Sequence, residues 1–155
     1  MTTESAAPLG TTPAVTAEVV RADIQSTALS INELVDAVRH PSAGAVVIFV
    51  GYVRNRDHGE AVEVLDYTCH PSAEQVAREL AGRLAADGRT IRLGVVHRVG
   101  HLTVGDIAVV AAVSAAHRRE AFDVCTALID EFKRTVPIWK HQVFADGSDE
   151  WVGLP

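Results

Sequence analysis

Apolar residues along the chain form two kinds of pattern, and each pattern predicts a different kind of element. Runs that are continuous or that alternate with polar residues predict strands, whereas a spacing of three or four positions predicts helices. Continuous β-branched runs, above all Gly44-Ala45-Val46-Val47-Ile48-Phe49-Val50-Gly51, are typical of strands that are buried on both faces of a sheet. Shorter or alternating runs bounded by turn residues, such as Asp57-His58-Gly59 and Val104-Gly105-Asp106, indicate further strands. Together these patterns predict strands over residues 18–24, 44–53, 62–67, 91–99, 107–114, 138–144 and 151–152.

Apolar residues spaced three or four positions apart predict three helices. Ser30-Ile31-Asn32-Glu33 has the Ser-x-x-Glu form of a capping box, so a short helix should begin there and end before Pro41. A second helix is expected to carry Pro71 in its first turn and to end at Asp87-Gly88. A third, amphipathic helix is predicted over residues 117–134.

The order of these elements predicts a mixed α+β fold in a single domain. Residues 1–16 are rich in Thr, Ala and Pro and show no period, as expected of a disordered leader, so the domain is assigned to residues 17–155. With 48% hydrophobic residues in a chain of 155, the sequence can bury a core of the size that is common for one domain.

Charge and composition narrow the range of functions. The net charge of −6 argues against a general nucleic-acid or membrane-surface binder, because both need a basic face. No window approaches the ~20 apolar residues that span a bilayer, and the N-terminus lacks the pattern of a secretory signal, so a cytoplasmic protein is expected.

Cys69 and Cys125 fit no metal knuckle or disulfide framework and are interpreted as core thiols. His97 and His101 lie in a β-rich context that does not suit a helical metal pair, so no metal is assigned.

Against this acidic background, two lysines flank a proline in Lys133-Arg134-Thr135-Val136-Pro137-Ile138-Trp139-Lys140. Lys133 should close the last helix and Lys140 should lie in the extended segment after Pro137, so both ammonium groups can reach one pocket. Neighbouring ammonium groups disfavour each other's protonation, and a desolvated lysine beside a second cation can act as a base or a nucleophile. The alternative interpretation is that Lys133 only complements the negative end of the helix.

A second basic cluster falls where the last helix should begin. His117-Arg118-Arg119 follows an apolar strand, so free backbone N–H groups and cationic side chains could face one anion, such as a phosphate. Cations at a helix N-terminus oppose the helix dipole, so stability alone would not select them there. Arg54 and Arg56 form a third cationic position, at the end of the 44–53 strand. A solvated basic turn is the alternative for the second cluster.

Five short motifs occur in one order along the chain. They are Gly44-Ala45-Val46-Val47-Ile48-Phe49-Val50-Gly51-x-Val53-Arg54, His97-Arg98-Val99-Gly100, Val104-Gly105-Asp106, Ser114-Ala115-x-His117-Arg118-x-x-Ala121-Phe122 and Lys133-x-x-x-Pro137-Ile138-Trp139-Lys140. Each motif is weak alone, but their order over residues 44–152 resembles the large catalytic subunits of molybdopterin synthase, the MoaE family. The chain departs from the family pattern at two places. Tyr52 replaces a small or hydroxyl residue, and Gly153-Leu154-Pro155 stands where many relatives continue into a polar tail.

The resemblance implies an α/β-hammerhead-like core with additional strands and helices, and a sulfurtransferase activity. Members of this family convert cyclic pyranopterin monophosphate into molybdopterin, which carries a dithiolene. The sulfur comes from the C-terminal Gly-Gly thiocarboxylate of a small ubiquitin-like subunit, so neither a catalytic cysteine nor a cofactor nor a metal is expected. The resemblance also implies a central homodimer within a heterotetramer.

The motifs also imply roles for single residues. Lys133 corresponds to the principal catalytic lysine of the family, and Lys140 corresponds to its second active-site lysine. Four further residues correspond to positions that contact the substrate or line its pocket: Arg54, His117, Arg118 and Phe49. Two other functions stay open, namely an inactive paralogue that acts as a partner-binding scaffold and an unrelated phosphosugar- or nucleotide-binding enzyme. No glycine-rich phosphate loop supports the second of these.

Overall fold

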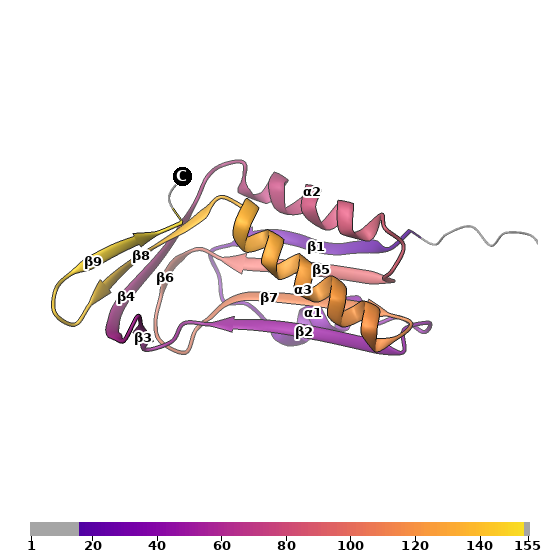
Figure 1. Cartoon of the computed structure of the whole chain (residues 1–155), viewed down its shortest axis with the longest axis horizontal. Coiled ribbons are helices and arrows are strands. Elements are labelled where there is room, and N and C mark those ends of the chain that lie inside the picture. Colours follow the sequence, from indigo (N-terminus) through magenta and orange to yellow (C-terminus); the bar gives the residue numbers. More distant parts are fainter. Residues whose placement is uncertain (1–15, 154–155) are drawn as a thin grey trace, which may run out of the picture.

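The computed structural model describes residues 16–153, and within that range the chain forms nine strands and three helices (Figure 1). In chain order they are β1 (Glu18–Gln25), α1 (Ile31–Val38), β2 (Ala45–Tyr52), β3 (Arg56–Asp57), β4 (Glu60–Cys69), α2 (Ala73–Ala85), β5 (Arg92–Arg98), β6 (Gly100–Leu102), β7 (Ile107–Ala115), α3 (Arg118–Thr135), β8 (Ile138–Phe144) and β9 (Asp149–Val152). No helix in this range is long and apolar enough to cross a membrane. Apart from Thr16, the leader that the sequence predicts lies outside the described residues.

Four strands form one layer of the fold. Their order is β1-β5-β7-β2, with β1 parallel to β5 and the other two pairs antiparallel. Helices α2 and α3 lie across one face of this sheet, and α1 covers the other face (Figure 1). Because both faces are covered, the central strands of the sheet must be apolar on both sides.

Strand β7 divides its side chains between two cores. Val109, Ala111 and Val113 pack into the core beneath α2 and α3. Val110 and Ala112 point to the opposite face and pack with α1. Successive side chains of a strand point to opposite faces, so one continuous apolar run can serve both cores.

The second sheet is antiparallel and stands beside the first (Figure 1). Its strands are ordered β3-β4-β8-β9, and the short β6 also pairs with β4. It has a small core of its own, built from Val53, Val62, Leu65, Leu102, Ala108 and Phe144. Helix α3 ends at the junction of the two sheets, directly before β8 begins (Figure 1).

The structure confirms the mixed α+β class and most of the predicted elements. The first half of the capping box is confirmed, since the backbone N–H of Glu33 donates to Ser30 Oγ at 3.3 Å. The predicted placement of Pro71 is wrong, because α2 begins only at Ala73 and Ser72 is its N-cap residue. The sequence pattern also misses β3 and β6, because strands of two and three residues are too short to show a period.

Gly94 in β5 tests how closely α1 packs on the first sheet. A Cβ at this position would lie 2.8 Å from Leu34 Cδ1, 3.1 Å from Val20 Cγ2 and 3.2 Å from the carbonyl oxygen of Arg21. Gly94→Ala is therefore expected to lower the free energy of unfolding by about 1–3 kcal/mol through overpacking. Chemical denaturation of the purified variant measures this loss.

Gly82→Ala is the matched control for this substitution. A Cβ at Gly82 in α2 meets nothing within 4 Å, so replacing a helical glycine there should raise the free energy of unfolding, by up to about 1 kcal/mol. Equal unfolding free energies for the two variants would contradict the close packing of α1 on β5.

Candidate functional site

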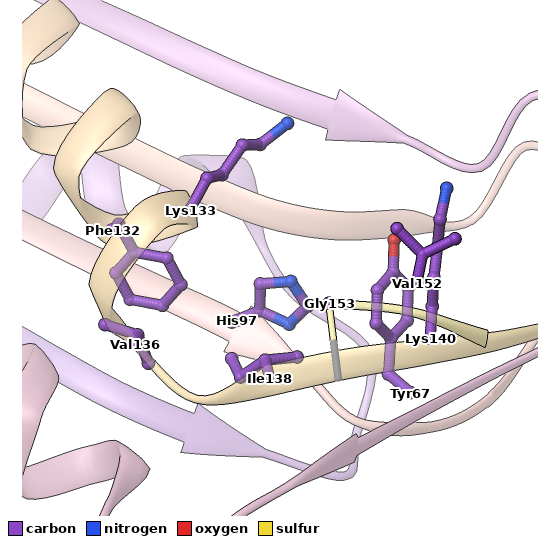
Figure 2. A pocket seen from close by; sticks show the side chains of 9 residues that line it. All are labelled: Tyr67, His97, Phe132, Lys133, Val136, Ile138, Lys140, Val152 and Gly153. Carbon is purple, nitrogen blue, oxygen red and sulfur yellow. The ribbon is translucent and has the colours of Figure 1, made fainter. Parts of the chain in front are cut away.

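A pocket of about 280 Å³ opens at the junction of the two sheets, where α3 ends. Four elements supply its polar groups, namely Lys133 from α3, Lys140 from β8, Tyr67 from β4 and His97 from β5. Figure 2 shows the two lysines at opposite sides of the pocket, with His97 between them in this view. The remaining wall is mostly apolar and comprises Phe132, Val136, Ile138, Val152 and Gly153.

The chain between the two lysines explains why they meet. The N–H of Val136 closes the last turn of α3 by donating to the carbonyl of Phe132 at 3.0 Å. Pro137 cannot continue a helix, so the chain leaves α3 in an extended form and β8 begins at the next residue. The structure thus brings Lys133 and Lys140 to one pocket, as their spacing predicts. They are the only lysines of the sequence, which also has twelve arginines.

A second hollow, of about 240 Å³, adjoins the first and is more polar in its lining. The two hollows share Tyr67, Lys133 and Lys140. The further polar residues of the second hollow are Tyr52, Arg54, Asp57 and Gln142. The two lysines therefore stand between an apolar hollow and a polar one, and the predicted substrate contact Arg54 reaches the polar one.

Among the described residues, Asp57 supplies the only carboxylate of the two hollows, and it is buried. Its Oδ2 accepts hydrogen bonds from Gln142 Nε2 at 2.6 Å and from Lys140 Nζ at 3.3 Å. Its Oδ1 accepts one from Arg54 Nη2 at 3.1 Å. The hydrogen bond from Gln142, together with the charge of Lys140, lowers the pKa of Asp57 to about 2 even though burial opposes this shift. The polar hollow therefore contains a carboxylate that is ionised at neutral pH.

Lys133 has different surroundings from Lys140. Among residues 16–153, no carboxylate forms an ion pair with Lys133. Its Nζ lies 5.8 Å from the centre of the Phe49 ring, which is within the range of a cation–π contact. Phe49 comes from β2 and lines neither of the two hollows, because it borders a separate hollow together with Phe122 and Cys125. The structure therefore does not place this predicted pocket residue in the wall of either lysine hollow, although its ring contacts Lys133. The hydrogen-bonding capacity of the Lys133 amine is left for a ligand.

His97 is buried between two aromatic rings. Its imidazole lies edge-on to Tyr67 with ring centres 4.9 Å apart, and it stacks on Phe132 at 5.9 Å. Nδ1 is 2.7 Å from the carbonyl oxygen of Arg98, so Nδ1 carries the proton and donates it to that oxygen. Burial, with a smaller contribution from the charge of Lys133, lowers the pKa of His97 to about 4. The imidazole is therefore neutral at pH 7 and can accept a hydrogen bond at Nε2.

His117 and Arg118 lie at the other end of α3, where His117 is the N-cap residue. Both border an open hollow of about 500 Å³ on the surface. Lys133 follows Arg118 by fifteen positions along α3, which at ~1.5 Å per residue puts their backbones roughly 22 Å apart. Within one chain, the structure therefore does not bring these two predicted substrate contacts to the lysines.

The cysteines and the potential metal ligands of the described residues are poorly suited to chemistry at this site. Cys125 belongs to the core as predicted, and burial raises the pKa of its thiol to about 11. Cys69 is only partly buried, which differs from the prediction. Ligand atoms of Asp57, His58 and Glu150 lie within 4.8 Å of one another. However, Asp57 already binds the cationic groups of a lysine and an arginine, and these would repel a metal ion.

Comparison with known proteins shows the family of the chain that forms this pocket. The family profile described as MoaE protein matches residues 24–135. The molybdopterin synthase catalytic subunit 1 of Mycobacterium tuberculosis is 41% identical over 126 residues, which cover 81% of this chain and 85% of that protein. The chain belongs to the MoaE family.

Solved structures similar to this MoaE chain share its fold. The X-ray structure of molybdopterin synthase from Staphylococcus aureus matches with a TM-score of 0.77 and 32% identity, over 84% of this chain and 96% of that one. A MoaE protein from Burkholderia ambifaria matches with a TM-score of 0.71 and 32% identity, over 88% of both chains. The arrangement of two sheets and three helices is therefore that of the MoaE family.

Sequence patterns do not identify three polar residues of this MoaE site, namely Tyr67, Asp57 and Gln142. Asp57 has the sequence context of an exposed turn, and only the fold of its hairpin onto β8 reveals its burial. Gln142 does carry a usable signal, because it follows Lys140 by two positions in a predicted strand and must share its face. Tyr67 lies opposite Lys140 in the β4–β8 pairing, and that register is not visible in the sequence.

The buried, neutral His97 predicts that the MoaE fold is sensitive to acid. An unfolded histidine titrates near pH 6.5, whereas the pKa of His97 in the folded chain is about 4. Between these values the unfolded chain binds the additional proton, so this stabilisation is fully present above about pH 6.5 and is lost as the pH falls through about 4. The loss should amount to about 3 kcal/mol of unfolding free energy, measurable by chemical denaturation across this range.

His97→Phe should remove this part of the pH dependence, whatever it does to stability at neutral pH, because phenylalanine does not titrate. His101→Phe serves as the control, since His101 is exposed and pairs with Asp66 on the outer side of β4. If His97→Phe retains the acid-dependent loss of the wild type, other groups cause it.

Proposed function

We propose that this chain is the catalytic subunit of molybdopterin synthase and acts as a sulfurtransferase. In the proposed reaction, sulfur passes from the C-terminal thiocarboxylate of a small ubiquitin-like carrier subunit to cyclic pyranopterin monophosphate and forms the dithiolene of molybdopterin. The observation that carries this proposal is that the only two lysines of a MoaE-family chain line one pocket. The M. tuberculosis relative supports it, because that protein is named as a catalytic subunit.

Each stage of this reaction requires a proton to move. Sulfur must attack the pterin side chain, and an oxygen substituent must leave with a proton. Water must then hydrolyse the acyl link to the carrier tail, which regenerates the carboxylate of the tail before the next transfer. We assign the general acid and base role to Lys133, whose amine contacts an aromatic ring and no carboxylate among the described residues. Such a group typically contributes ~10²–10⁴-fold in rate.

Lys140 and Arg54 suit the stabilisation of negative charge. Both donate to the Asp57 carboxylate, which orients them in the polar hollow. A cation that is already oriented toward developing negative charge needs no reorganisation when that charge appears. We therefore assign the polar hollow to the phosphate-bearing pyranopterin.

The apolar hollow suits the tail of the carrier subunit. Its wall is mostly apolar, and both lysines line it. An extended Gly-Gly segment has no side chains, so it can enter a passage that would be too narrow for other residues. Nε2 of His97 could accept a hydrogen bond from a backbone N–H of this tail, because its Nδ1 already donates to Arg98.

The length of α3 favours a homodimer. His117 and Arg118 lie roughly 22 Å from Lys133 in the same chain, so they can contact the same substrate only from a second copy. Strand β2 offers a surface for this contact, because it is an edge strand whose Val46 and Ile48 are exposed. A two-fold contact along β2 and α3 would bring the start of one α3 beside the end of the other. With one carrier subunit for each pocket, the assembly is a heterotetramer.

Lys133→Ala is expected to abolish product formation. The assay mixes the purified chain with thiocarboxylated carrier and cyclic pyranopterin monophosphate and detects the dithiolene product by mass spectrometry. Lys133→Arg should stay impaired, because arginine keeps the charge but does not readily release a proton. Lys140→Ala should lose less activity if this residue mainly stabilises charge. Folding and carrier binding should change little in both Lys133 variants.

Arg134→Ala is the matched control, because this cation in the last turn of α3 lines neither hollow. It should retain the turnover of the wild type. A wild-type single-turnover rate in Lys133→Ala would refute the assigned role. A wild-type chain that binds the carrier but forms no product would instead be a partner-binding scaffold.

Mixed dimers test whether the two ends of α3 serve different copies. Arg118→Ala should weaken pyranopterin binding by ~1.5–3 kcal/mol, as expected for a lost charge-assisted hydrogen bond. Co-expressed Lys133→Ala and Arg118→Ala chains should regain activity, because one site of each mixed dimer then has both residues intact. Light scattering verifies the dimer. A verified mixed dimer without recovered activity, or a strictly monomeric chain at micromolar concentration, would contradict the shared site.

A further inference from the structure

The β3–β4 hairpin has two unfavourable features, a buried carboxylate at Asp57 and a positive φ at His58. Asp57 is only 7% exposed, and burial of a carboxylate is unfavourable unless the group is paired and hydrogen-bonded. The next two residues, His58 and Gly59, both have a positive φ, of 50° and 84°. A turn of this kind matches the twist of a two-stranded hairpin, but a positive φ is uncommon for histidine. The hairpin places the Asp57 carboxylate against β8.

Strand β8 meets this carboxylate with two donors on the same face. Gln142 is 1% exposed, and its Nε2 lies between two carboxylates, 2.6 Å from Asp57 Oδ2 and 3.2 Å from Glu150 Oε2. Lys140, two residues earlier in the strand, reaches the same Asp57 oxygen at 3.3 Å. Its side chain is only 26% exposed, whereas the side chain of Arg54, which binds the other oxygen, is 78% exposed. The main cationic partner that Asp57 holds is therefore Lys140.

We propose that Asp57 is a positioning residue for sulfur transfer, because it anchors the ammonium group of Lys140 in the polar hollow and so leaves Lys133 as the mobile amine of the site. This inference rests on the proposed function. In this proposal, the two lysines have different roles because their neighbouring side chains differ. One is held by a buried carboxylate, and the other lies near an aromatic ring.

A purely structural role for Asp57 would not require a charged side chain. A neutral residue that accepts a hydrogen bond from Gln142 would suffice to close the hairpin onto β8. Only a charged carboxylate can hold Lys140 in a hollow that Lys133 and Arg54 also line, because these cations repel one another. Removal of the charge should therefore impair turnover without weakening the binding of an anionic substrate, since the hollow becomes more positive.

Asp57→Asn tests this separation, because asparagine has nearly the same size and can still accept a hydrogen bond from Gln142. The single-turnover rate should fall by about 10²-fold, as expected when a group at a reaction centre is displaced. Calorimetry should show that the pyranopterin binds at least as tightly as it does to the wild type. Asp66→Asn is the matched control. Asp66 lies in β4 and faces His101 at 3.1 Å, away from both hollows, so its variant should keep the wild-type rate.

Wild-type turnover in Asp57→Asn would overturn the proposal. An equal loss of turnover and of substrate binding, together with a lower unfolding temperature, would also overturn it and would indicate a structural role. Asp57→Glu restores the charge and should recover part of the turnover that Asp57→Asn loses.

The anchoring can also be measured without any reaction, because the chain has only two lysines. Lysine labelled with carbon-13 at Cε gives one signal for each, and Lys140→Arg assigns them. In the wild type, relaxation on the picosecond to nanosecond timescale should show that Cε of Lys140 is more ordered than Cε of Lys133. In Asp57→Asn this difference should disappear. Equal mobility of the two lysines in the wild type would refute the anchoring even if Asp57→Asn fails to fold. Failure of the proposed function appears separately, as a wild-type chain that forms no product.

Discussion

The short connection between α3 and β8 constrains the whole site. Only Val136 and Pro137 separate the last residue of the helix from the first residue of the strand. Helix α3 packs on the four-stranded sheet, and β8 is an inner strand of the other sheet, so this connection also joins the two layers. Lys133 and Lys140 lie on either side of it. They could separate only if the last turn of α3 or the first pairs between β4 and β8 were broken.

The three cations at this junction do not share the Asp57 carboxylate equally. Two lysines and an arginine line one small hollow, where like charges would push the side chains outward into water. Asp57 offsets part of this repulsion, but of these three cations it contacts only Lys140 and Arg54. Lys133 is left with the face of Phe49 as its neighbour. One hollow therefore contains one amine that a carboxylate holds and a second amine that no carboxylate of the described residues holds.

The sequence predicts those features that depend on local pattern. The continuous apolar runs of β2 and β7 predict strands, and the end of α3 is visible because Pro137 follows it. The meeting of the two lysines follows from these local signals. The prediction that β2 is buried on both faces is wrong, because β2 is an edge strand whose Val46 and Ile48 are exposed. The surroundings of Asp57 are not predictable in this way, because Lys140, which pairs with it, is 83 residues away in the sequence.

Other parts of the site depend on tertiary structure that no short pattern contains. The motif that includes His97 is visible in the sequence, but its neutral state depends on rings contributed by β4 and α3. The resemblance to the family assigns His117 and Arg118 to the substrate site. A linear motif cannot indicate which copy of the chain they serve, and only the length of α3 raises that question.

We propose that this chain moves sulfur from a carrier tail to a pterin at the pocket between its two sheets. The most direct measurement follows the carrier itself by intact-mass spectrometry in a mixture of wild-type chain, thiocarboxylated carrier and cyclic pyranopterin monophosphate. We expect the thiocarboxylate to become a carboxylate only when the pyranopterin is present, with two carrier tails converted for each dithiolene formed. A thiocarboxylate that persists, or that hydrolyses equally fast without the pyranopterin, would contradict it.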